Sequence, residues 1–287
     1  MKSLVIAGIQ RSTLYSPNHV GNDAAIFSAT ADWLGNAGYR VRMYTEQEFL
    51  SAGIREDVVV TMLRNAQAVH RLQELEKNGC LAVNSGFGIE NCTRERMTRL
   101  LMDHQVPHPD SFIMDTHEDV ATYLKDKQFM PCWVKRGDFH AIHREDVTYV
   151  RKEDELREII AEYALRDINR VVVNEHLRGD LVKFYGVAGT NFFHWFYPFN
   201  ENHSKFGYEE INGHPEGIPF SLDDLREICD RAAGVLQVVV YGGDCIISPD
   251  GSIRIIDFND WPSFAPCRIE AAREIAKKII QMINERK

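Results

Sequence analysis

The chain has 287 residues, 44% of them hydrophobic, which is enough to bury the cores of two or three lobes. Its 33 Lys and Arg residues against 42 Asp and Glu residues give a formal net charge of -9, and this balance argues against a nucleic-acid-binding surface, which is normally basic. The 6 cysteines show no Cys-x-x-Cys spacing, so we expect free thiols in a reducing cytoplasm, with neither a disulfide framework nor a zinc site.

Residues 1–90 alternate short apolar segments with segments of helical periodicity. This pattern predicts a small, mostly parallel sheet with helices on its faces. The first apolar segment is too short for a signal peptide or a membrane span, and we expect no membrane partner. No Gly-x-Gly-x-x-Gly motif follows it, which disfavours a Rossmann dinucleotide fold. The expected strands are 4–9, 40–44, 57–61 and 81–83, and the expected helices are 23–36 and 67–77.

The polar residues after the first strand are candidates for contacting a substrate. Gln10, Arg11 and Ser12 follow that strand directly, and the segment 16–23 comes next. Ligands of open α/β sheets bind beyond the carboxyl ends of the strands. These residues are therefore either substrate contacts or an ordinary polar surface loop.

The middle of the chain begins with a helix and continues as mixed strands and helices. Thr93 is a candidate N-cap for a helix over 94–104, which ends before two prolines. The segment 198–219 is polar, aromatic and long for a connection, so it is either a lid over the acceptor substrate or partly disordered. The expected strands are 111–114, 132–135, 147–150, 170–175, 181–187 and 191–197, and the expected helices are 118–125 and 152–165.

A helix, a tight hairpin and a second helix end the chain. Ser221 caps the first helix, expected over 222–236, and an amphipathic helix is expected over 268–286. The hairpin strands, 244–248 and 252–257, flank the sequence Ser-Pro-Asp-Gly, whose proline and glycine favour a tight turn.

The hairpin brings three oxygen-bearing side chains together. Pairing across the turn places Asp244 near the level of Asp257, and Asn259 points from the same face because side chains alternate along a strand. Two carboxylates and an amide oxygen form the hard, all-oxygen ligand set that suits Mg²⁺. The alternative is that these Asp and Asn residues only form turns, which they do commonly.

The order Asp, strand-turn-strand, then acidic-x-Asn-x-x-Pro resembles the metal-binding end of the ATP-grasp superfamily, which includes ligases of the glutathione synthetase and D-alanine:D-alanine ligase type. The resemblance implies an α/β fold with a small parallel N-terminal α/β lobe and two α+β lobes that sandwich ATP. The implied boundaries are 1–90, 91–176 and 177–287.

The resemblance also implies ligands for Mg²⁺ and for the phosphates of ATP. The Mg²⁺ ligands are Asp244, Asp257 and Asn259, with Asp257 standing where the family more often has Glu. The basic residues implied for the phosphates are Arg96, with Arg94 and Arg99 as alternatives, Lys135 at the end of an apolar strand, and Lys183 facing the transferred phosphoryl group.

Further residues are implied for the loop over the phosphates and for the nucleoside. The loop after Lys135 has one glycine, so Arg136, His140 or His143 would supply side-chain contacts there. The residues implied for the nucleoside are Glu175, His176 and Leu177 as the hinge beneath the adenine and Asp180 as the acid on the ribose, with Glu175 as the competing choice.

These assignments predict a Mg²⁺- and ATP-dependent ligase that joins a small-molecule carboxylate to an amine through an acyl phosphate. Arg11 and Arg268 are the candidate anchors for a substrate carboxylate. Two alternatives remain, namely a small-molecule kinase with the same fold and a nucleotide-binding module without turnover. Because dimers are usual among such enzymes, a homodimer is one expected assembly.

Overall fold

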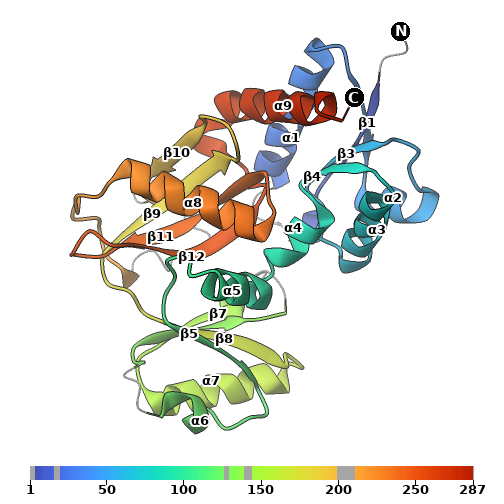
Figure 1. Cartoon of the computed structure of the whole chain (residues 1–287). Coiled ribbons are helices and arrows are strands. Elements are labelled where there is room, and N and C mark those ends of the chain that lie inside the picture. Colours follow the sequence, from blue (N-terminus) through green and yellow to red (C-terminus); the bar gives the residue numbers. More distant parts are fainter. Residues whose placement is uncertain (1–3, 16–19, 126–128, 139–143, 199–210, 287) are drawn as a thin grey trace.

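The computed structural model describes residues 4–15, 20–125, 129–138, 144–198 and 211–286. Three four-stranded sheets form three lobes (Figure 1). We name these the first, middle and third lobes, in chain order. The predicted α/β class, with one parallel sheet and two further α+β lobes, is confirmed.

The first lobe is a parallel sheet with helices on both faces. Its strand order is β2-β1-β3-β4, and all three pairings are parallel. Every residue of β3 is buried, as expected for an apolar strand covered on both sides. The elements are β1 (Val5–Ile9), α1 (Val20–Asn36), β2 (Arg40–Tyr44), α2 (Glu46–Ala52), β3 (Val58–Thr61), α3 (Ala66–Lys77) and β4 (Leu81–Val83). The sequence pattern did not predict α2, which begins with a capping box formed by Thr45 and Glu48.

The middle lobe is an antiparallel sheet with the order β5-β8-β6-β7, covered on its outer face by helices (Figure 1). Leu156, Ile160 and Tyr163 are buried in its core because they share one face of α7. The elements are β5 (Ser111–Asp115), α6 (Ala121–Leu124), β6 (Cys132–Arg136), β7 (Val147–Val150), α7 (Glu153–Leu165) and β8 (Arg170–Glu175).

The third lobe is an antiparallel sheet with the order β10-β9-β11-β12. One face packs on α8, whose N-cap Ser221 accepts the predicted backbone hydrogen bond from Asp224 at 3.1 Å. Met97 and Leu101 of α5 enter the same core, so this helix packs with the third lobe although it precedes the middle one in sequence. The elements are α5 (Arg94–Asp103), β9 (Asp180–Val187), β10 (Phe193–Phe196), α8 (Leu222–Leu236), β11 (Val240–Ile247), β12 (Ile253–Asp260) and α9 (Arg268–Asn284). The short helix α4 (Gly86–Asn91) precedes α5 and packs its Ile89 into the core of the first lobe.

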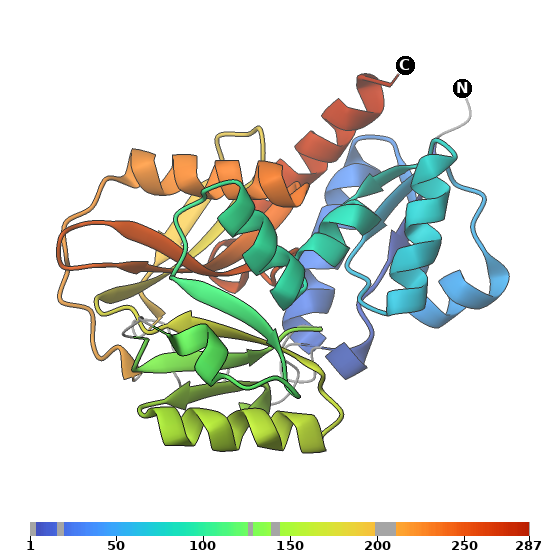
Figure 2. The ribbon, with the colours of Figure 1, turned by 60° about the horizontal axis from the view of Figure 1, so that its bottom comes forward.

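The last helix joins the first lobe to the third. Figures 1 and 2 both show α9 lying beside α1, and one hydrophobic cluster contains residues of both helices, of the first sheet and of the third lobe. Trp261 and Phe264 of the third lobe are fully buried in that cluster. None of the helices in the described part of the chain is long and apolar enough to cross a membrane.

Two arginines of the first lobe bind the chain directly after the predicted metal ligand Asn259. Arg64 pairs with Asp260, with 2.8 Å between Nη2 and Oδ1, and also donates to the carbonyl oxygen of that residue at 3.2 Å. Arg11 donates to the carbonyl oxygen of Trp261 at 3.0 Å. Because Asp260 is fully buried, its charge depends on this arginine.

We expect Arg64→Met to lower the free energy of unfolding by about 3–5 kcal/mol, because it leaves a buried carboxylate without its counter-charge. Arg157→Met is the matched control, since Arg157 is 43% exposed and its partners Asp119 and Glu153 are 65% and 50% exposed, and it should cost at most about 1 kcal/mol. Urea denaturation measures both changes. Equal, small effects would show that the lobe junction does not depend on the buried pair.

Candidate functional site

The predicted hairpin forms, and a β-bulge between Asp244 and Cys245 interrupts its register. Asp244 on β11 is the direct partner of Asp257 on β12, and Lys183 on β9 is the direct partner of Asp244. Direct partners on neighbouring strands point to the same face. We call these three residues the charged row. Asn259 lies two residues beyond Asp257 and therefore extends the same face.

Each carboxylate of the charged row holds a cation. Lys183 Nζ lies 3.0 Å from Asp244 Oδ1, and Arg94 Nη1 lies 2.6 Å from Asp257 Oδ1. The side-chain amide of Asn259 donates to Asp257 Oδ2 at 3.0 Å. Burial alone would raise the pKa of Asp257, but the charges of Arg94 and Lys135 outweigh it and lower the pKa, so this carboxylate is ionised at neutral pH.

Lys135 reaches the charged row from the middle lobe. It is the fourth residue of β6, is 7% exposed and donates to the carbonyl oxygen of Ile256 on β12 at 3.1 Å. Burial, and then repulsion from Arg94, lower its pKa to about 7, while Asp257 and Asp244 partly oppose the shift. The lysine predicted for the phosphates therefore lies between two lobes, beside the predicted metal ligands.

An apolar row adjoins the charged row on the same face. Leu181 and Ile246 are direct partners on β9 and β11, each two residues from the charged row. They form a buried cluster with Leu177, against which Ile256 packs. Together, the two rows place a surface that suits an apolar, planar group beside a surface that suits an anion.

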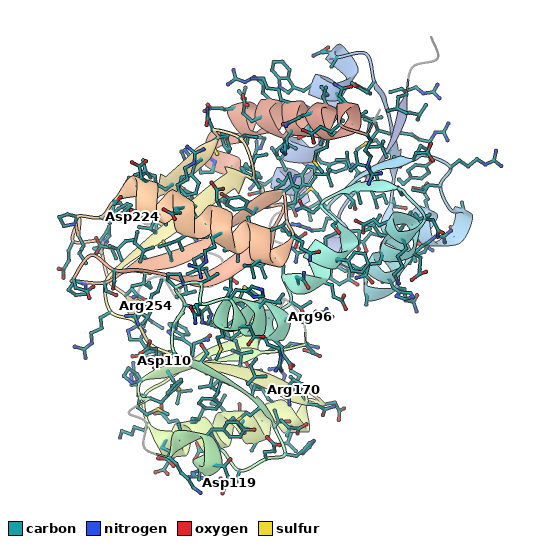
Figure 3. All side chains as sticks on the ribbon, viewed as in Figure 1. Arg96, Asp110, Asp119, Arg170, Asp224 and Arg254 are labelled. Carbon is teal, nitrogen blue, oxygen red and sulfur yellow. The ribbon has the colours of Figure 1, made fainter. Side chains whose placement is uncertain are left out.

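The hinge segment after β8 is held by the middle and third lobes. Glu175 pairs with Arg254 of β12 at 2.8 Å, and Figure 3 shows Arg254 where these lobes meet. His176 Nδ1 lies 3.2 Å from Trp133 Nε1, and Leu177 is buried. Of the three predicted hinge residues, Leu177 packs in the cluster of the apolar row.

Asp180, predicted as the ribose acid, is engaged within the protein. Its carboxylate accepts the backbone N–H groups of Glu216 at 2.7 Å and Ile218 at 2.8 Å, and the residue is 3% exposed. In this structure it anchors the segment that precedes α8. Glu175, the competing choice, is more exposed and remains the candidate.

Among the arginines of α5, the structure brings Arg94 to the predicted metal ligands in place of Arg96. Arg96 pairs with Glu90 at 2.8 Å, its side chain is 52% exposed, and Figure 3 labels it beside α5. Arg99 pairs with Glu95 on the exposed side. Arg94 is 9% exposed at its side chain, and its guanidinium lies on Asp257 of β12.

Arg11 and Arg268, predicted as carboxylate anchors, both have partners within the protein. Arg11 pairs with Asp23 at 3.0 Å and donates to two backbone oxygens, so its role is to join the lobes. Arg268 donates to Asn22 Oδ1 at 2.7 Å, but its Nε is buried without a partner among the described residues. Arg136 pairs with Asp138 through two hydrogen bonds, and His140 and His143 lie outside the described residues.

The donor set fits a hard divalent cation. Among the residues that the structure describes, no group of three His, Cys, Asp or Glu side chains is placed to hold a metal ion, so a cation here depends on two carboxylates and the Asn259 amide. Carboxylate and amide oxygens suit Mg²⁺, and an ionised Asp257 adds to the attraction. Arg94 and Lys183 balance the two carboxylates, and Lys135 adds a positive charge when it is protonated, which suits an anion bound with the metal.

The fold matches solved structures along nearly the whole chain. The chain is 16% identical to the D-alanine–D-alanine ligase of Bacillus anthracis complexed with ATP, covering 99% of this chain and 97% of that one with a TM-score of 0.70. The D-alanyl-alanine synthetase A of Vibrio cholerae is 12% identical (99% and 98% covered, TM-score 0.70), and the ATP-grasp ligase PsnB is 16% identical (98% and 99% covered, TM-score 0.62).

No family model matches the sequence, and no curated protein matches it. At the identities of the solved structures, their likeness establishes the architecture. The chain has the ATP-grasp fold, with the parallel first lobe and the two antiparallel sheets that the sequence predicted.

The lowered pKa of Lys135 gives stability a characteristic pH dependence. Between the folded pKa of about 7 and the unfolded pKa near 10.4, the unfolded state binds more protons, so the free energy of unfolding should rise with pH. We expect Lys135→Met to remove this rise, by at most about 1.4 kcal/mol per pH unit. Urea denaturation at pH 7–9 tests it against Lys277→Met, whose lysine is 62% exposed. If the free energy of unfolding changed with pH by the same slope in the wild type and in both variants, the lowered pKa of Lys135 would be contradicted.

Proposed function

We propose that the protein is a Mg²⁺- and ATP-dependent ligase that joins a small-molecule carboxylate to an amine through an acyl phosphate. The single observation that carries this proposal is the charged row. Two carboxylates face each other in register, and cations from the middle lobe, the third lobe and α5 surround them. The ATP-grasp fold and its neighbours, which are named as ligases and include one complexed with ATP, support the same reaction class.

The residues of the proposed site form three groups, which bind the metal ion, the phosphates and the nucleoside. Asp244, Asp257 and Asn259 would hold Mg²⁺, which when bound neutralises charge on the β- and γ-phosphates. Lys135, Lys183 and Arg94 are the cations that contact the phosphates, and the lysines must exchange their present protein partners for phosphate oxygens. The apolar row receives the adenine, and the carboxylate of Glu175 accepts ribose hydroxyls.

The reaction requires positioning and charge neutralisation more than an enzyme nucleophile. A substrate carboxylate oxygen attacks the γ-phosphorus, and the bond from that phosphorus to the bridging oxygen breaks, releasing ADP. The amine nitrogen then attacks the acyl carbon, the bond to the phosphate oxygen breaks, and the amine loses a proton as phosphate leaves. Cations held in a buried site stabilise the charge that develops in the first step.

The reaction class is tested by measuring ADP release across a panel of acids and amines, followed by mass spectrometry of the products. We expect ADP and free phosphate only when both an acid and an amine are present. A phosphorylated product that accumulates without free phosphate would identify a kinase. ATP binding with no ADP formed across the panel would identify a nucleotide-binding module without turnover.

Asp257→Asn tests the metal ligand. The substitution keeps the shape of the side chain but removes the charge that attracts the cation, and it also frees Arg94 from its pair. We expect Mg²⁺-dependent turnover to fall at least about 100-fold, with circular dichroism unchanged. Turnover equal to the wild type would show that Asp257 does not hold the metal.

A matched pair of arginines tests the phosphate site. Arg94 lies on Asp257 and Arg96 lies on Glu90, although both belong to the first turn of α5. Arg94→Lys should weaken ATP binding about 10-fold or more, because a lysine cannot reproduce the forked contact, whereas Arg96→Lys should leave it within about twofold. Isothermal titration with Mg-ATP measures both. Equal affinities of the two variants for Mg-ATP would show that Arg94 does not contact the nucleotide.

A further inference from the structure

The Asp257 carboxylate has a hydrogen-bond donor on each of its two oxygens. Arg94 Nη1 lies 2.6 Å from Oδ1, and the Asn259 amide donates to Oδ2 at 3.0 Å. A carboxylate that bridges two metal ions gives one oxygen to each ion, whereas here one oxygen is held by a charged group of the protein itself. Since each carboxylate oxygen can accept two contacts, Oδ2 can still serve one metal ion alongside Asn259.

Arg94 is held in place by the helix that carries it. It is the first residue of α5, which lies between the third and middle lobes (Figures 1 and 2) and packs its apolar side into the core of the third lobe. The next residue, Glu95, donates its backbone N–H to the carbonyl oxygen of Gly137 at 2.9 Å. Its carboxylate also pairs with Arg170 of the middle lobe at 3.0 Å. The backbone that carries Arg94 is therefore anchored to both lobes.

A second metal ion on Asp257 Oδ1 would have to displace the Arg94 guanidinium. The Arg94 side chain is 9% exposed, so losing its partner would leave a largely buried charge unpaired, which is strongly unfavourable. Lys135 lies nearby, because its Nζ is 3.1 Å from the carbonyl oxygen of Ile256, the residue before Asp257. A divalent ion at Oδ1 would therefore lie close to two basic side chains, which repel it when they are protonated.

The guanidinium can perform the task of a second metal ion. In two-metal sites, ions about 3.5–4 Å apart neutralise the charge of the transferring phosphoryl group. A guanidinium has five N–H donors in one plane, so it can hold a carboxylate at one edge and phosphate oxygens at another. Among the residues that the structure describes, the Arg94 guanidinium bonds to Asp257 alone, which leaves donors for phosphate oxygens.

We infer that the site works with a single divalent cation and that the Arg94 guanidinium replaces a second one. The cation binds to Asp244, Asp257 and Asn259, and Arg94 joins Asp257 Oδ1 to the phosphates. The inference rests on the proposed function, because that function assigns these residues to a complex of metal and nucleotide.

Mn²⁺ in place of Mg²⁺ allows the bound ions to be counted by electron paramagnetic resonance. The protein, in slight excess over β,γ-imido-ATP and well above the Kd, is titrated with Mn²⁺, so that all of the nucleotide is bound to protein. We expect one bound Mn²⁺ per nucleotide, with the spectrum of an isolated ion. Two bound ions per nucleotide, with a spectrum broadened by coupling between ions about 3.5–4 Å apart, would overturn the inference.

Two variants of α5 test whether Arg94 takes the place of the second ion. Arg94→Met keeps most of the apolar stem but removes the guanidinium from Asp257 Oδ1. Arg96→Met is the matched control, since Arg96 pairs with Glu90 and is 52% exposed. We expect two bound Mn²⁺ per nucleotide in Arg94→Met and one in Arg96→Met. Circular dichroism checks that both variants are folded, and if Arg94→Met is not, the count in the wild type decides.

The outcomes separate this inference from the proposed function. One ion in the wild type and two in Arg94→Met support the inference. Equal counts in these two proteins, whether one or two, overturn it and leave the ligase proposal intact. One ion in the wild type without ADP release across the panel of acids and amines supports the metal count but overturns the ligase proposal. Nucleotide binding that takes up no Mn²⁺ overturns both.

Discussion

The charged row imposes the constraint on which the rest of the structure depends. Antiparallel pairing places Asp244 and Asp257 next to each other on one face, and two neighbouring carboxylates repel unless cations lie between or beside them. This repulsion is offset by Lys183 from the adjacent strand, Arg94 from α5 and Lys135 from the middle lobe. The same electrostatic requirement therefore brings three separate parts of the fold to one place.

The lobes are held around this row by polar contacts as well as by apolar packing. On one side, the arginines of the first lobe bind the backbone and carboxylate directly after Asn259, within a core that α9 shares with α1. On the other side, Arg254 and Lys135 bridge β12 to the middle lobe. The hairpin is thus held from two directions, and its three oxygen-bearing side chains gain a fixed orientation, which is what a preorganised cation site requires.

Much of the fold follows from local sequence patterns, because strand and helix periods and turn residues act over short distances. The Ser-Pro-Asp-Gly turn pairs Ile247 with Ile253, and a β-bulge between Asp244 and Cys245 then shifts the register by one residue and places Asp244 opposite Asp257. Local spacing predicted the turn but not the bulge. Local patterns do not show which of Arg94, Arg96 and Arg99 lies beside the predicted metal ligands. That depends on how α5 is rotated about its own axis. Asp180 and Arg11 have internal partners that are distant in sequence, so their roles could not be read from local spacing.

The most direct measurement is a crystal structure with Mg²⁺ and a non-hydrolysable ATP analogue. We expect a metal ion at about 2.1 Å from oxygen atoms of Asp244, Asp257 and Asn259, with phosphate oxygens completing its coordination. Lys135 and Lys183 should leave Ile256 and Asp244 and lie on the phosphates. A nucleotide bound elsewhere, or a Lys183 that still pairs with Asp244 beside a bound nucleotide and no metal, would contradict the account.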